Sequence, residues 1–517
     1  MIASTLQPSV RLSSVLQGIY PLHAGSDRDL HDITLDSRSV QAGSLFMACK
    51  GASHDGRLHV DQAIAKGAAA ILVEADEVDW CCEQLKDGVP ILPVLNLHEQ
   101  MAELAARFFG EPGKKMRMIG VTGTNGKTTT TQLLANAHVA LGHRCGVIGT
   151  LGHGMAGSAI AGNEQGPGTT PDAVAMQKIL ASMREQQAHT VVMEVSSHAL
   201  DQRRILVDDY AVAVFTNLSR DHLDYHGSME AYGAAKRKLF QGQALQLAVL
   251  NADDAYASAT AGLLPPDVRC FTWSINNPVA DIHAVSIEFL PRGVELVVKT
   301  PWGIFNFASR LLGTFNVSNL LAVLTTVLAS ESLQPQFDPA ALIAVIADLN
   351  AVVGRMQLVS GYPVTAVIDY AHTPDGLRNA LQAVREHCQG RLWCVIGCGG
   401  ERDRGKRPQM AGLAELMADH LVLTDDNPRL EASASILADM QTGLQQPARA
   451  CIIADRAKAI GLALDSAEPG DIVLIAGKGH EQYQEVAGIR HPFSDAAIAS
   501  DLLARRFGNK AQMEVGQ

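Results

Sequence analysis

Short apolar runs separated by helix-like segments dominate the middle of the chain. The runs at 118–121, 190–195, 211–215 and 247–250 lack the alternation of a half-exposed strand, and helical patterns lie between them. Strands that are buried on both faces have this appearance, which is typical of a parallel sheet covered by helices. The pattern therefore predicts an α/β domain here.

The same rhythm returns in the last third of the chain, where helical patterns separate further apolar runs. These runs lie at 364–369, 392–397, 420–424, 450–454 and 472–476. The repetition favours a second doubly wound α/β domain.

The beginning of the chain mixes shorter strand candidates with helical patterns. The strand candidates lie at 33–35, 44–48, 69–73 and 89–95. A helical pattern at 99–109 is followed by Gly110 and Pro112, which indicate a helix stop and then a linker. We therefore expect a small N-terminal α/β domain.

Apolar and polar residues alternate on both sides of the turn Pro291-Arg292-Gly293. The apolar positions are Val285, Ile287 and Phe289 before the turn, and Val294, Leu296 and Val298 after it. Period-two alternation around a glycine turn predicts an antiparallel hairpin, inserted in the middle domain. A helical pattern follows at about 316–329.

Composition narrows the class of protein. Hydrophobic residues make up 47% of the 517 residues, and 42 Lys and Arg stand against 54 Asp and Glu, giving a net charge of −12. This balance argues against broad binding to nucleic acids or anionic membranes. No apolar run approaches the ~18 residues of a membrane span, and the N-terminus lacks the apolar core of a signal peptide. The nine cysteines show no zinc-like spacing. We expect a soluble, cytoplasmic protein.

A glycine-rich turn follows the run at 118–121 and leads into a helical pattern that ends near Gly142. Glycines let backbone N–H groups surround phosphates, while Lys127 adds positive charge and Thr128 offers a hydroxyl to Mg²⁺. Val121 stands where the common P-loop pattern has its first glycine. The alternative is a tight turn before a helix with an exposed lysine.

Polar residues follow the next two apolar runs. Glu194 lies near the end of one run, and the loop 216–227, which contains His222, follows the other. Ligands bind at the carboxyl ends of parallel strands, so Glu194 could reach a metal beside the P-loop. A helix cap and an ordinary polar loop are the alternatives. The basic residues 236–238 lie in a helix capped by Ser228, and a solvated helix face is their default interpretation.

Taken together, these segments resemble the Mur ligases of peptidoglycan synthesis. The matching segments are 121–130, 194–198, 217–227, Lys236, 315–319, 354–355, 369–375 and 426–429. They extend over nearly the whole chain, and the altered P-loop of this family accounts for Val121.

The resemblance implies a three-domain amide ligase. ATP would phosphorylate the D-glutamate γ-carboxylate of UDP-N-acetylmuramoyl-L-alanyl-D-glutamate, and meso-2,6-diaminopimelate would attack the acyl phosphate through its amine. Mg²⁺ and cationic side chains would neutralise the approaching anions. The expected fold is α/β with a small N-terminal domain at 1–112 for the UDP-sugar, a central P-loop-type mononucleotide-binding domain at 113–352 for ATP, and a C-terminal Rossmann-like domain at 353–517 for the amino acid.

The resemblance also assigns roles to individual residues. Catalytic roles fall to Lys127, Lys236, His222 and Glu194. The ATP-binding residues would be Gly123, Thr124, Asn125, Gly126, Lys127, Thr128, Thr129, Asn316, Arg355 and Asp369. The metal ligands would be Thr128, Glu194, His222 and Lys236, the last as a CO₂-derived carbamate. The UDP-sugar would contact Leu35, Ser37, Ala52, Ser53 and His54, and the muramoyl dipeptide would contact Thr169, Thr170, Ser196, Gln202 and Arg204.

The amino-acid site would consist of Arg402, Asp426, Asn427, Pro428, Arg429, Gly477 and Glu481. A guanidinium pairs bidentately with a carboxylate, and diaminopimelate has a distal carboxylate that lysine lacks. The alternatives are a lysine-adding Mur ligase, a folate polyglutamylating ligase and a non-catalytic nucleotide-binding regulator. We expect a monomer whose partners are small-molecule substrates, with no nucleic acid and no membrane insertion.

Overall fold

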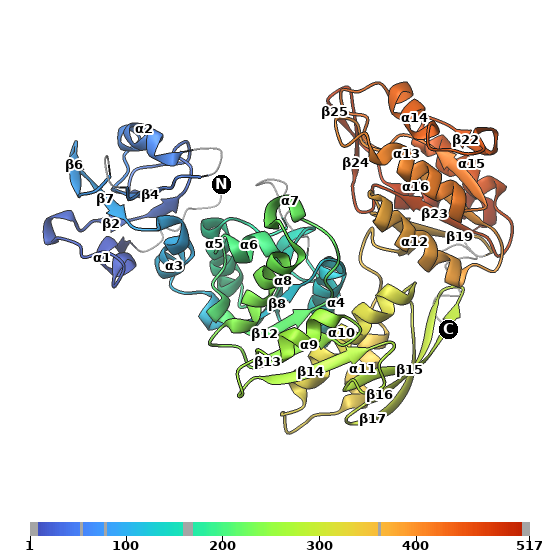
Figure 1. The fold of residues 1–517 in the computed structure, drawn as a ribbon, viewed down its shortest axis with the longest axis horizontal. Coiled ribbons are helices and arrows are strands. Elements are labelled where there is room, and N and C mark those ends of the chain that lie inside the picture. Colours follow the sequence, from blue (N-terminus) through green and yellow to red (C-terminus); the bar gives the residue numbers. More distant parts are fainter. Residues whose placement is uncertain (1–8, 52–54, 77–79, 159–168, 360–362, 509–517) are drawn as a thin grey trace. The chain divides into compact units, whose positions relative to one another are not determined.

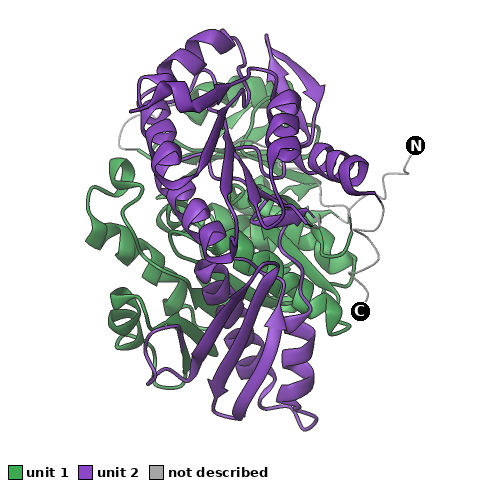
Figure 2. Cartoon of the chain, turned by 90° about the vertical axis from the view of Figure 1, so that its right-hand side faces the viewer, with its two compact units in different colours: residues 1–272 green, residues 273–517 purple. Residues whose placement is uncertain are grey.

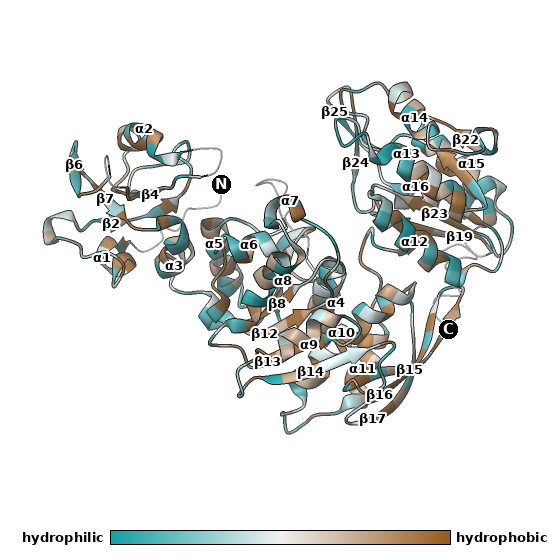
Figure 3. Cartoon of the chain, viewed as in Figure 1, coloured by the Kyte–Doolittle hydropathy of each residue, from teal (hydrophilic) through white to brown (hydrophobic). Residues whose placement is uncertain are grey.

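The computed structural model describes residues 9–51, 55–76, 80–158, 169–359 and 363–508. The chain forms two compact units, Met1–Thr272 and Trp273–Gln517, which Figure 2 shows in different colours. Each unit is described by itself. Figure 3 shows that apolar residues concentrate on the strands, as the sequence pattern predicts. In the described ranges, no helix combines the length and apolar character needed to cross a membrane.

The first unit begins with a small sheet in the order β3-β4-β5-β7-β6, in which only β6 runs antiparallel to its neighbour. Its strands are β3 (Asp32–Thr34), β4 (Ser44–Ala48), β5 (Ala70–Glu74), β6 (Gln84–Lys86) and β7 (Val89–Val94). Helices α1 (Leu12–Leu16) and α3 (Leu97–Phe108) share one buried cluster with the sheet, and α2 (Val60–Ala65) shares another. A short ladder of β1 (Val10–Arg11) and β2 (Asp29–Leu30) precedes them. The small N-terminal α/β fold is confirmed.

A larger sheet contains, side by side, the strands β10-β9-β11-β8-β12-β13, and β14 continues it. Figure 1 labels β8, β12, β13 and β14 of this sheet. Its strands are β8 (Arg117–Thr122), β9 (Cys145–Gly149), β10 (Gly152–Met155), β11 (Thr190–Glu194), β12 (Tyr210–Phe215) and β13 (Leu247–Asn251). All pair in parallel except β10, so the predicted parallel sheet is confirmed. The associated helices are α4 (Lys127–Ala140), α5 (Ala173–Glu185), α6 (Ser197–Asp201), α7 (Leu223–His226), α8 (Met229–Arg237) and α9 (Ala255–Ala261). Strand β14 (Arg269–Ser274) contains the boundary of the unit.

The second unit opens with the predicted hairpin. Strands β15 (Ile282–Leu290), β16 (Gly293–Thr300) and β17 (Gly303–Ser309) pair antiparallel, and helices α10 (Thr314–Glu331) and α11 (Pro339–Ala347) follow. Val285 was expected on the buried face but is 54% exposed. The pairing shifts between Ala284 and Ser286, and such a bulge turns the extra residue away from the face that period two assigns.

A doubly wound sheet completes the second unit, in the order β18-β19-β23-β20-β21-β22. Its strands are β18 (Gln357–Val359), β19 (Thr365–Asp369), β20 (Leu392–Ile396), β21 (His420–Leu423), β22 (Ala450–Ile452) and β23 (Ile472–Ala476). Only β18 pairs antiparallel. Helices α12 (Pro374–His387), α13 (Lys406–Met417) and α14 (Ser433–Gln441) share one core cluster with the strands, and α15 (Arg456–Ser466) and α16 (Asp495–Phe507) share a second. The hairpin β24 (Tyr483–Val486) and β25 (Ile489–Pro492) follows β23. This part confirms the Rossmann-like prediction.

Candidate functional site

The glycine-rich turn between β8 and α4 has the backbone of a phosphate-binding loop. Gly123 has a φ of 147° and Gly126 a φ of 83°, and α4 begins at the next residue, Lys127. A Cβ on Gly123 would lie 1.9 Å from the hydroxyl of Thr216, so only glycine lets the two loops approach. The predicted strand, glycine turn and helix are therefore present in the right order, and the N-terminus of α4 opens onto the turn, as in anion-binding loops.

Two lysine amines converge on the carbonyl of Gly123. Lys127 Nζ donates to the carbonyls of Gly123 and Thr124 at 2.9 and 2.8 Å, and Lys236 Nζ donates to that of Gly123 at 2.7 Å. Lys236 is 1% exposed, so the default interpretation of a solvated helix face is wrong for this residue. Burial first, and the nearby charge of Lys127 second, lower the pKa of Lys236. The site therefore holds a buried amine that can lose its proton more readily than an ordinary lysine.

Glu194 lies at the end of β11 beside this loop and is fully buried. Its carboxylate accepts hydrogen bonds from the hydroxyls of Thr128 (3.0 Å) and Thr150 (3.1 Å) and from the backbone N–H of Thr150 (2.8 Å). Burial raises the pKa of Glu194, and these donors together with the charge of Lys127 oppose the rise. Gly149 is required here, because a Cβ would come within 2.2 Å of the Glu194 carboxylate. The structure thus brings Thr128 and Glu194 into contact, and their role as metal ligands stays a prediction.

The loop after β12 holds the phosphate-binding turn in place. Asn217 accepts the N–H of Asn125 at 2.9 Å, and the Thr216 hydroxyl donates to the Asn125 carbonyl at 2.6 Å. His222 follows in the left-handed conformation, with a φ of 51°. Its ring packs 4.8 Å from the ring of His198 and 5.9 Å from Tyr232. Over the described ranges, no three His, Cys, Asp or Glu side chains form a metal-binding group, so the metal role of His222 stays a prediction.

The residues predicted for the muramoyl dipeptide lie together next to Glu194. The Thr170 hydroxyl donates to the Glu194 carbonyl at 3.2 Å and accepts the N–H of Ser196 at 3.3 Å. Arg204 donates to the Thr170 carbonyl at 3.3 Å and to the Gln202 side chain at 2.8 Å. Thr169 is within 3.3 Å of the Thr150 hydroxyl. The structure therefore brings Thr169, Thr170, Ser196, Gln202 and Arg204 into one polar cluster.

The N-terminal sheet has a pocket of about 640 Å³ where Leu35 and Ser37 were predicted to bind the UDP-sugar. The lining residues are Leu35, Asp36, Ser37, Arg38, Phe46, Gly56, His59 and Gln62. Ser37 donates to Gln62 at 2.8 Å, which leaves both side chains at the pocket wall. Ala52, Ser53 and His54 lie outside the described residues.

In the second unit, three residues were predicted to contact the nucleotide. Asn316 is buried and donates to the Leu312 carbonyl at 2.9 Å. The Asp369 carboxylate caps two backbone N–H groups, those of Met356 (2.8 Å) and Ala371 (3.0 Å), and burial raises its pKa. The Arg355 guanidinium lies over the Tyr370 ring, 4.8 Å from its centroid, and its Nε is buried without a hydrogen-bond partner. Arg355 and Asp369 thus sit close together on neighbouring segments.

The loop after β21 gathers most of the predicted amino-acid site. Asn427 donates to Glu481 at 2.8 Å, and a Cβ on Gly477 would lie 2.5 Å from Asp426. Arg429 adopts the left-handed conformation with a φ of 55° and donates to the Gly400 carbonyl at 2.8 Å. Pro428 also packs on this segment, since a Cβ on Gly400 would lie 1.9 Å from its carbonyl oxygen. Arg402 is exposed and lies on the loop 399–405, which also contains Gly400.

Three residues at these sites escaped the sequence prediction. Lys478 is fully buried and donates to Asn427 at 3.0 Å and Glu481 at 2.9 Å. Thr150 makes two of the hydrogen bonds to Glu194, and Arg456 supports the floor of the amino-acid loop by donating to the Asp425 carbonyl at 3.1 Å. Lys478 and Thr150 each follow a buried strand within two residues, so the rule used for Glu194 could have found them.

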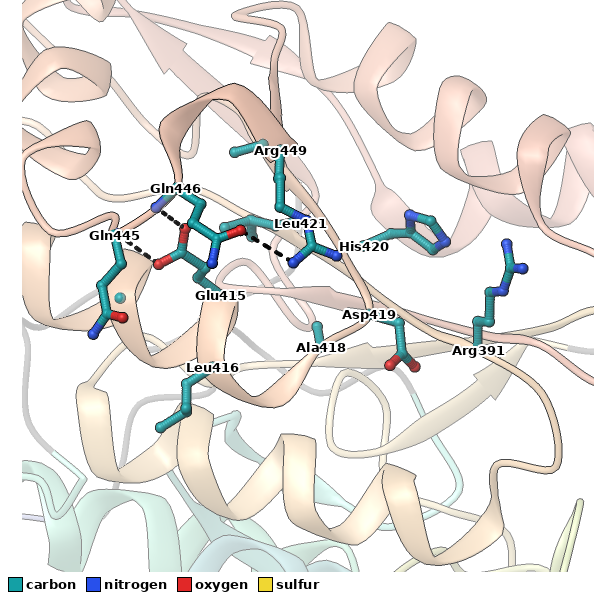
Figure 4. A pocket seen from close by; sticks show the side chains of 12 residues that line it. Arg391, Glu415, Leu416, Ala418, Asp419, His420, Leu421, Gln445, Gln446 and Arg449 are labelled. Atoms are coloured by element: carbon teal, nitrogen blue, oxygen red, sulfur yellow. Dashed lines mark hydrogen bonds between the residues drawn. The ribbon is translucent and has the colours of Figure 1, made fainter.

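Another pocket, of about 660 Å³, opens at the amino ends of β21 and β22, the edge opposite to the Asp426–Arg429 loop (Figure 4). Figure 4 shows Glu415 facing the Gln445-Gln446 turn. The Glu415 carboxylate accepts hydrogen bonds from the backbone N–H groups of these two residues at 2.7 and 2.8 Å. None of the predicted site residues lines this pocket.

Fold and geometry define an α/β protein with a phosphate-binding loop, a buried carboxylate beside it and a separate charged loop on a Rossmann-like sheet. Three family descriptions match the chain: the Mur ligase family catalytic domain at 29–109, the Mur ligase middle domain at 121–327 and the Mur ligase glutamate ligase domain at 354–479. The chain therefore belongs to the Mur ligase family, and the resemblance drawn from its motifs is confirmed.

Individual relatives agree. The chain is 47% identical to UDP-N-acetylmuramoyl-L-alanyl-D-glutamate–2,6-diaminopimelate ligase of Ectopseudomonas mendocina, over 92% of this chain and 95% of that protein. It is 46% identical to the ligase of the same name from Coxiella burnetii, over 90% and 94%. A solved structure of a ligase of this name has a TM-score of 0.70 and 36% identity, covering 95% of this chain and 99% of that one. The chain is a ligase with the three-domain α/β architecture of its family.

Proposed function

We propose that this ligase adds meso-2,6-diaminopimelate to the D-glutamate γ-carboxylate of UDP-N-acetylmuramoyl-L-alanyl-D-glutamate in peptidoglycan synthesis. The observation that carries the choice of amino acid is the loop after β21. The loop contains both Asp426 and Arg429, and the Arg429 guanidinium donates to the Gly400 carbonyl. Its Asn427 side chain donates to the Glu481 carboxylate, so both signs of charge belong to this region. The far end of diaminopimelate carries both a carboxylate and an ammonium, so a site with both signs of charge suits it, while lysine offers only the ammonium.

The reaction has two steps. The γ-carboxylate attacks the terminal phosphorus of ATP, forming an acyl phosphate and releasing ADP. The amine of diaminopimelate then attacks the acyl carbon, and the tetrahedral intermediate loses a proton and inorganic phosphate to leave the amide. Two anions must approach in the first step, so the positive charge of Lys127 lowers its barrier by neutralising charge.

The residues at the loop fit ATP and Mg²⁺. The Lys127 amine rests on loop carbonyls at 2.8–2.9 Å, a position from which it can turn to phosphate oxygens. Glu194 and the Thr128 hydroxyl supply the hard oxygen donors that Mg²⁺ prefers. When bound, the ion would polarise the phosphoryl oxygens and neutralise part of their charge. We assign Gly123 to Thr129 to the phosphates, and Asn316, Arg355 and Asp369 to the rest of the nucleotide.

Lys236 is proposed to carry a CO₂-derived carbamate. A carbamate forms on a neutral amine, and the support for it is that Lys236 is buried, that its pKa is lowered, and that it lies on the Gly123 carbonyl. The modification would replace a cation by an anionic oxygen donor, which suits a ligand of Mg²⁺ together with Glu194 and His222.

The substrate ends are assigned by domain. The pocket lined by Leu35 and Ser37 would hold the UDP end in residues 1–112, and the polar cluster around Thr170 and Arg204 would hold the dipeptide. Residues 113–352 would bind ATP, and residues 353–517 would bind the amino acid. The cytoplasmic location and the monomeric state stay predictions of the sequence.

The test is coupled ADP release with each substrate omitted in turn. We expect rapid release only when ATP, the UDP-dipeptide and diaminopimelate are all present, with lysine a poor replacement. Equal rates with lysine would contradict the assigned pocket. Release without any amino acid would favour a non-ligating nucleotide-binding protein.

A further inference from the structure

Lys478 is a fully buried cation with no part in the two reaction steps proposed above. It follows β23 by two residues, and none of its side chain is exposed. Taking an ammonium group out of water is costly unless fixed partners replace its hydration. The Lys478 amine has such partners, because it donates to the side-chain oxygen of Asn427 at 3.0 Å and to Glu481 Oε2 at 2.9 Å. The buried charge therefore holds two residues of the predicted amino-acid site.

Lys478 determines which way the Asn427 amide faces. The Asn427 oxygen accepts the Lys478 amine and also the backbone N–H of Glu485 at 2.9 Å, so both of its lone pairs are in use. The opposite orientation would turn the NH₂ group of Asn427 towards an ammonium and a second N–H, which would repel it. The amide nitrogen therefore faces Glu481 and donates to its Oε2 at 2.8 Å.

The same amine fixes one oxygen of the Glu481 carboxylate. Oε2 accepts hydrogen bonds from both Lys478 and Asn427, whereas Oε1 has no hydrogen-bond donor among the described residues. The Glu481 side chain is 20% exposed, while that of Lys478 is wholly buried. One carboxylate oxygen is thus held inside the protein, and the other is left to accept the ammonium of a substrate.

The network also reaches the backbone of Arg429. Glu485 of β24 donates its N–H to Asn427, and its carbonyl accepts the N–H of Arg429 at 2.9 Å. Arg429 has a φ of 55°, a conformation that a residue other than glycine keeps where the surrounding structure holds it. One strand residue therefore joins the partner of Lys478 to the segment that carries the Arg429 guanidinium.

We propose that Lys478 is a positioning residue for the amino-acid substrate. It holds Glu481, the acceptor of the substrate ammonium, directly and through Asn427. Through Asn427 and Glu485 it steadies Arg429, the donor to the distal carboxylate. This inference rests on the proposed function, because it concerns how the same site recognises diaminopimelate. Lys478 acts through these residues, so its loss should weaken substrate binding more than it slows the reaction of the bound substrate.

The test is steady-state kinetics of Lys478→Met, which keeps the length of the side chain and removes its charge. We expect the KM for diaminopimelate to rise about tenfold or more and kcat to change less than about threefold, because the lost contacts serve the end of the substrate that does not react. The KM values for ATP and the UDP-dipeptide should stay the same. Lys478→Arg should recover part of the loss, because it keeps the charge and the donors.

Lys458→Met is the matched control. Lys458 also pairs with a carboxylate three positions away, Asp455 at 3.6 Å, but its side chain is 78% exposed. Its substitution should leave every KM unchanged. Thermal unfolding checks the fold of each variant. If Lys478→Met does not fold, Lys478→Gln replaces it with the same expected rise in KM, because glutamine keeps a hydrogen-bond donor without the charge.

An unchanged KM for diaminopimelate in the folded variant would overturn the positioning role. A loss confined to kcat, or an equal rise in the KM for ATP, would overturn it as well, since either would show a defect outside amino-acid binding. The proposed function fails in a different way. If the wild type uses another amino acid and Lys478→Met raises the KM for that one, diaminopimelate is refuted and the positioning role is supported.

Discussion

Replacing Arg429 by alanine should selectively impair the use of diaminopimelate. The guanidinium uses one Nη1 hydrogen bond on the Gly400 carbonyl at 2.8 Å, which leaves donors on its other edge for the distal carboxylate of the substrate. Arg429 is only partly buried, so solvent screens the pair. We therefore expect the free energy of this ionic contact to lie at the low end of the usual range for charge-assisted pairs.

A loss of ~2–3 kcal/mol in transition-state stabilisation corresponds to a fall of about 30- to 150-fold in kcat/KM for diaminopimelate. The KM values for ATP and the UDP-dipeptide should change little, because the loop serves neither substrate in the assignment above. Lysine should remain a poor substrate, since removing a guanidinium does not create a partner for its ammonium. Arg429→Lys should fall between the two, because it keeps the charge and loses the planar fork.

The measurement is steady-state kinetics with each substrate varied in turn, on variants whose thermal unfolding matches that of the wild type. Arg404→Ala is the matched control, because Arg404 lies in the neighbouring loop but is paired with Asp439 at 2.9 Å. An unchanged kcat/KM for diaminopimelate in Arg429→Ala, or an equal loss in Arg404→Ala, would refute the reasoning.

Four further outcomes follow from the described contacts. Lys127→Ala should abolish ligation but leave the calorimetric Kd of the UDP-dipeptide nearly unchanged; equal loss of both in a folded variant would contradict the domain assignment. Lys236→Ala should be folded and nearly inactive, with partial rescue by short carboxylic acids, whereas wild-type turnover would rule out the carbamate. Arg456→Met should lower the free energy of unfolding in urea by ~3–5 kcal/mol, because it leaves the buried Asp495 unpaired, and the added Asp495→Leu change should restore most of it. Hydrogen bonds from Arg407 lower the pKa of Glu431 to about 2. The contribution of Glu431 to stability is therefore complete above about pH 4.5 and is lost as the pH falls towards 2. Glu431→Gln should flatten the pH dependence of the free energy of unfolding in urea over that interval, and an unchanged slope would contradict this.

The strands of both α/β sheets could be predicted because burial on two faces leaves a local signal. The run at 190–195, for example, corresponds to β11 at Thr190–Glu194, and 472–476 coincides with β23. The position of Val285 could not be predicted in this way. A bulge depends on how a strand pairs with its neighbour, which period two in one strand does not record.

At the site, the motifs indicated the residue types but not their burial. Three consecutive basic residues favour a solvated helix face. Lys236 is nevertheless buried, and its amine donates a hydrogen bond to the carbonyl of Gly123, 113 positions earlier in the chain. Arg456 was missed for the same reason, since its partners Asp425 and Asp495 lie on other segments. Whether a charged side chain is buried depends on long-range contacts, which a single sequence does not show.

The pairing of Arg456 with Asp495 has a consequence for the order in which the protein is made. Both side chains are fully buried, and Arg456 also donates to the carbonyls of Asp425 and Ala476, on the floor of the Asp426–Arg429 loop. Asp495 is the first residue of α16, so the ribosome adds it after every strand of the second unit. Until then Arg456 lacks its counter-ion. A nascent chain that ends before Asp495 therefore lacks the counter-ion of Arg456 beneath the Asp426–Arg429 loop, and we expect it not to bind the amino acid proposed for that loop.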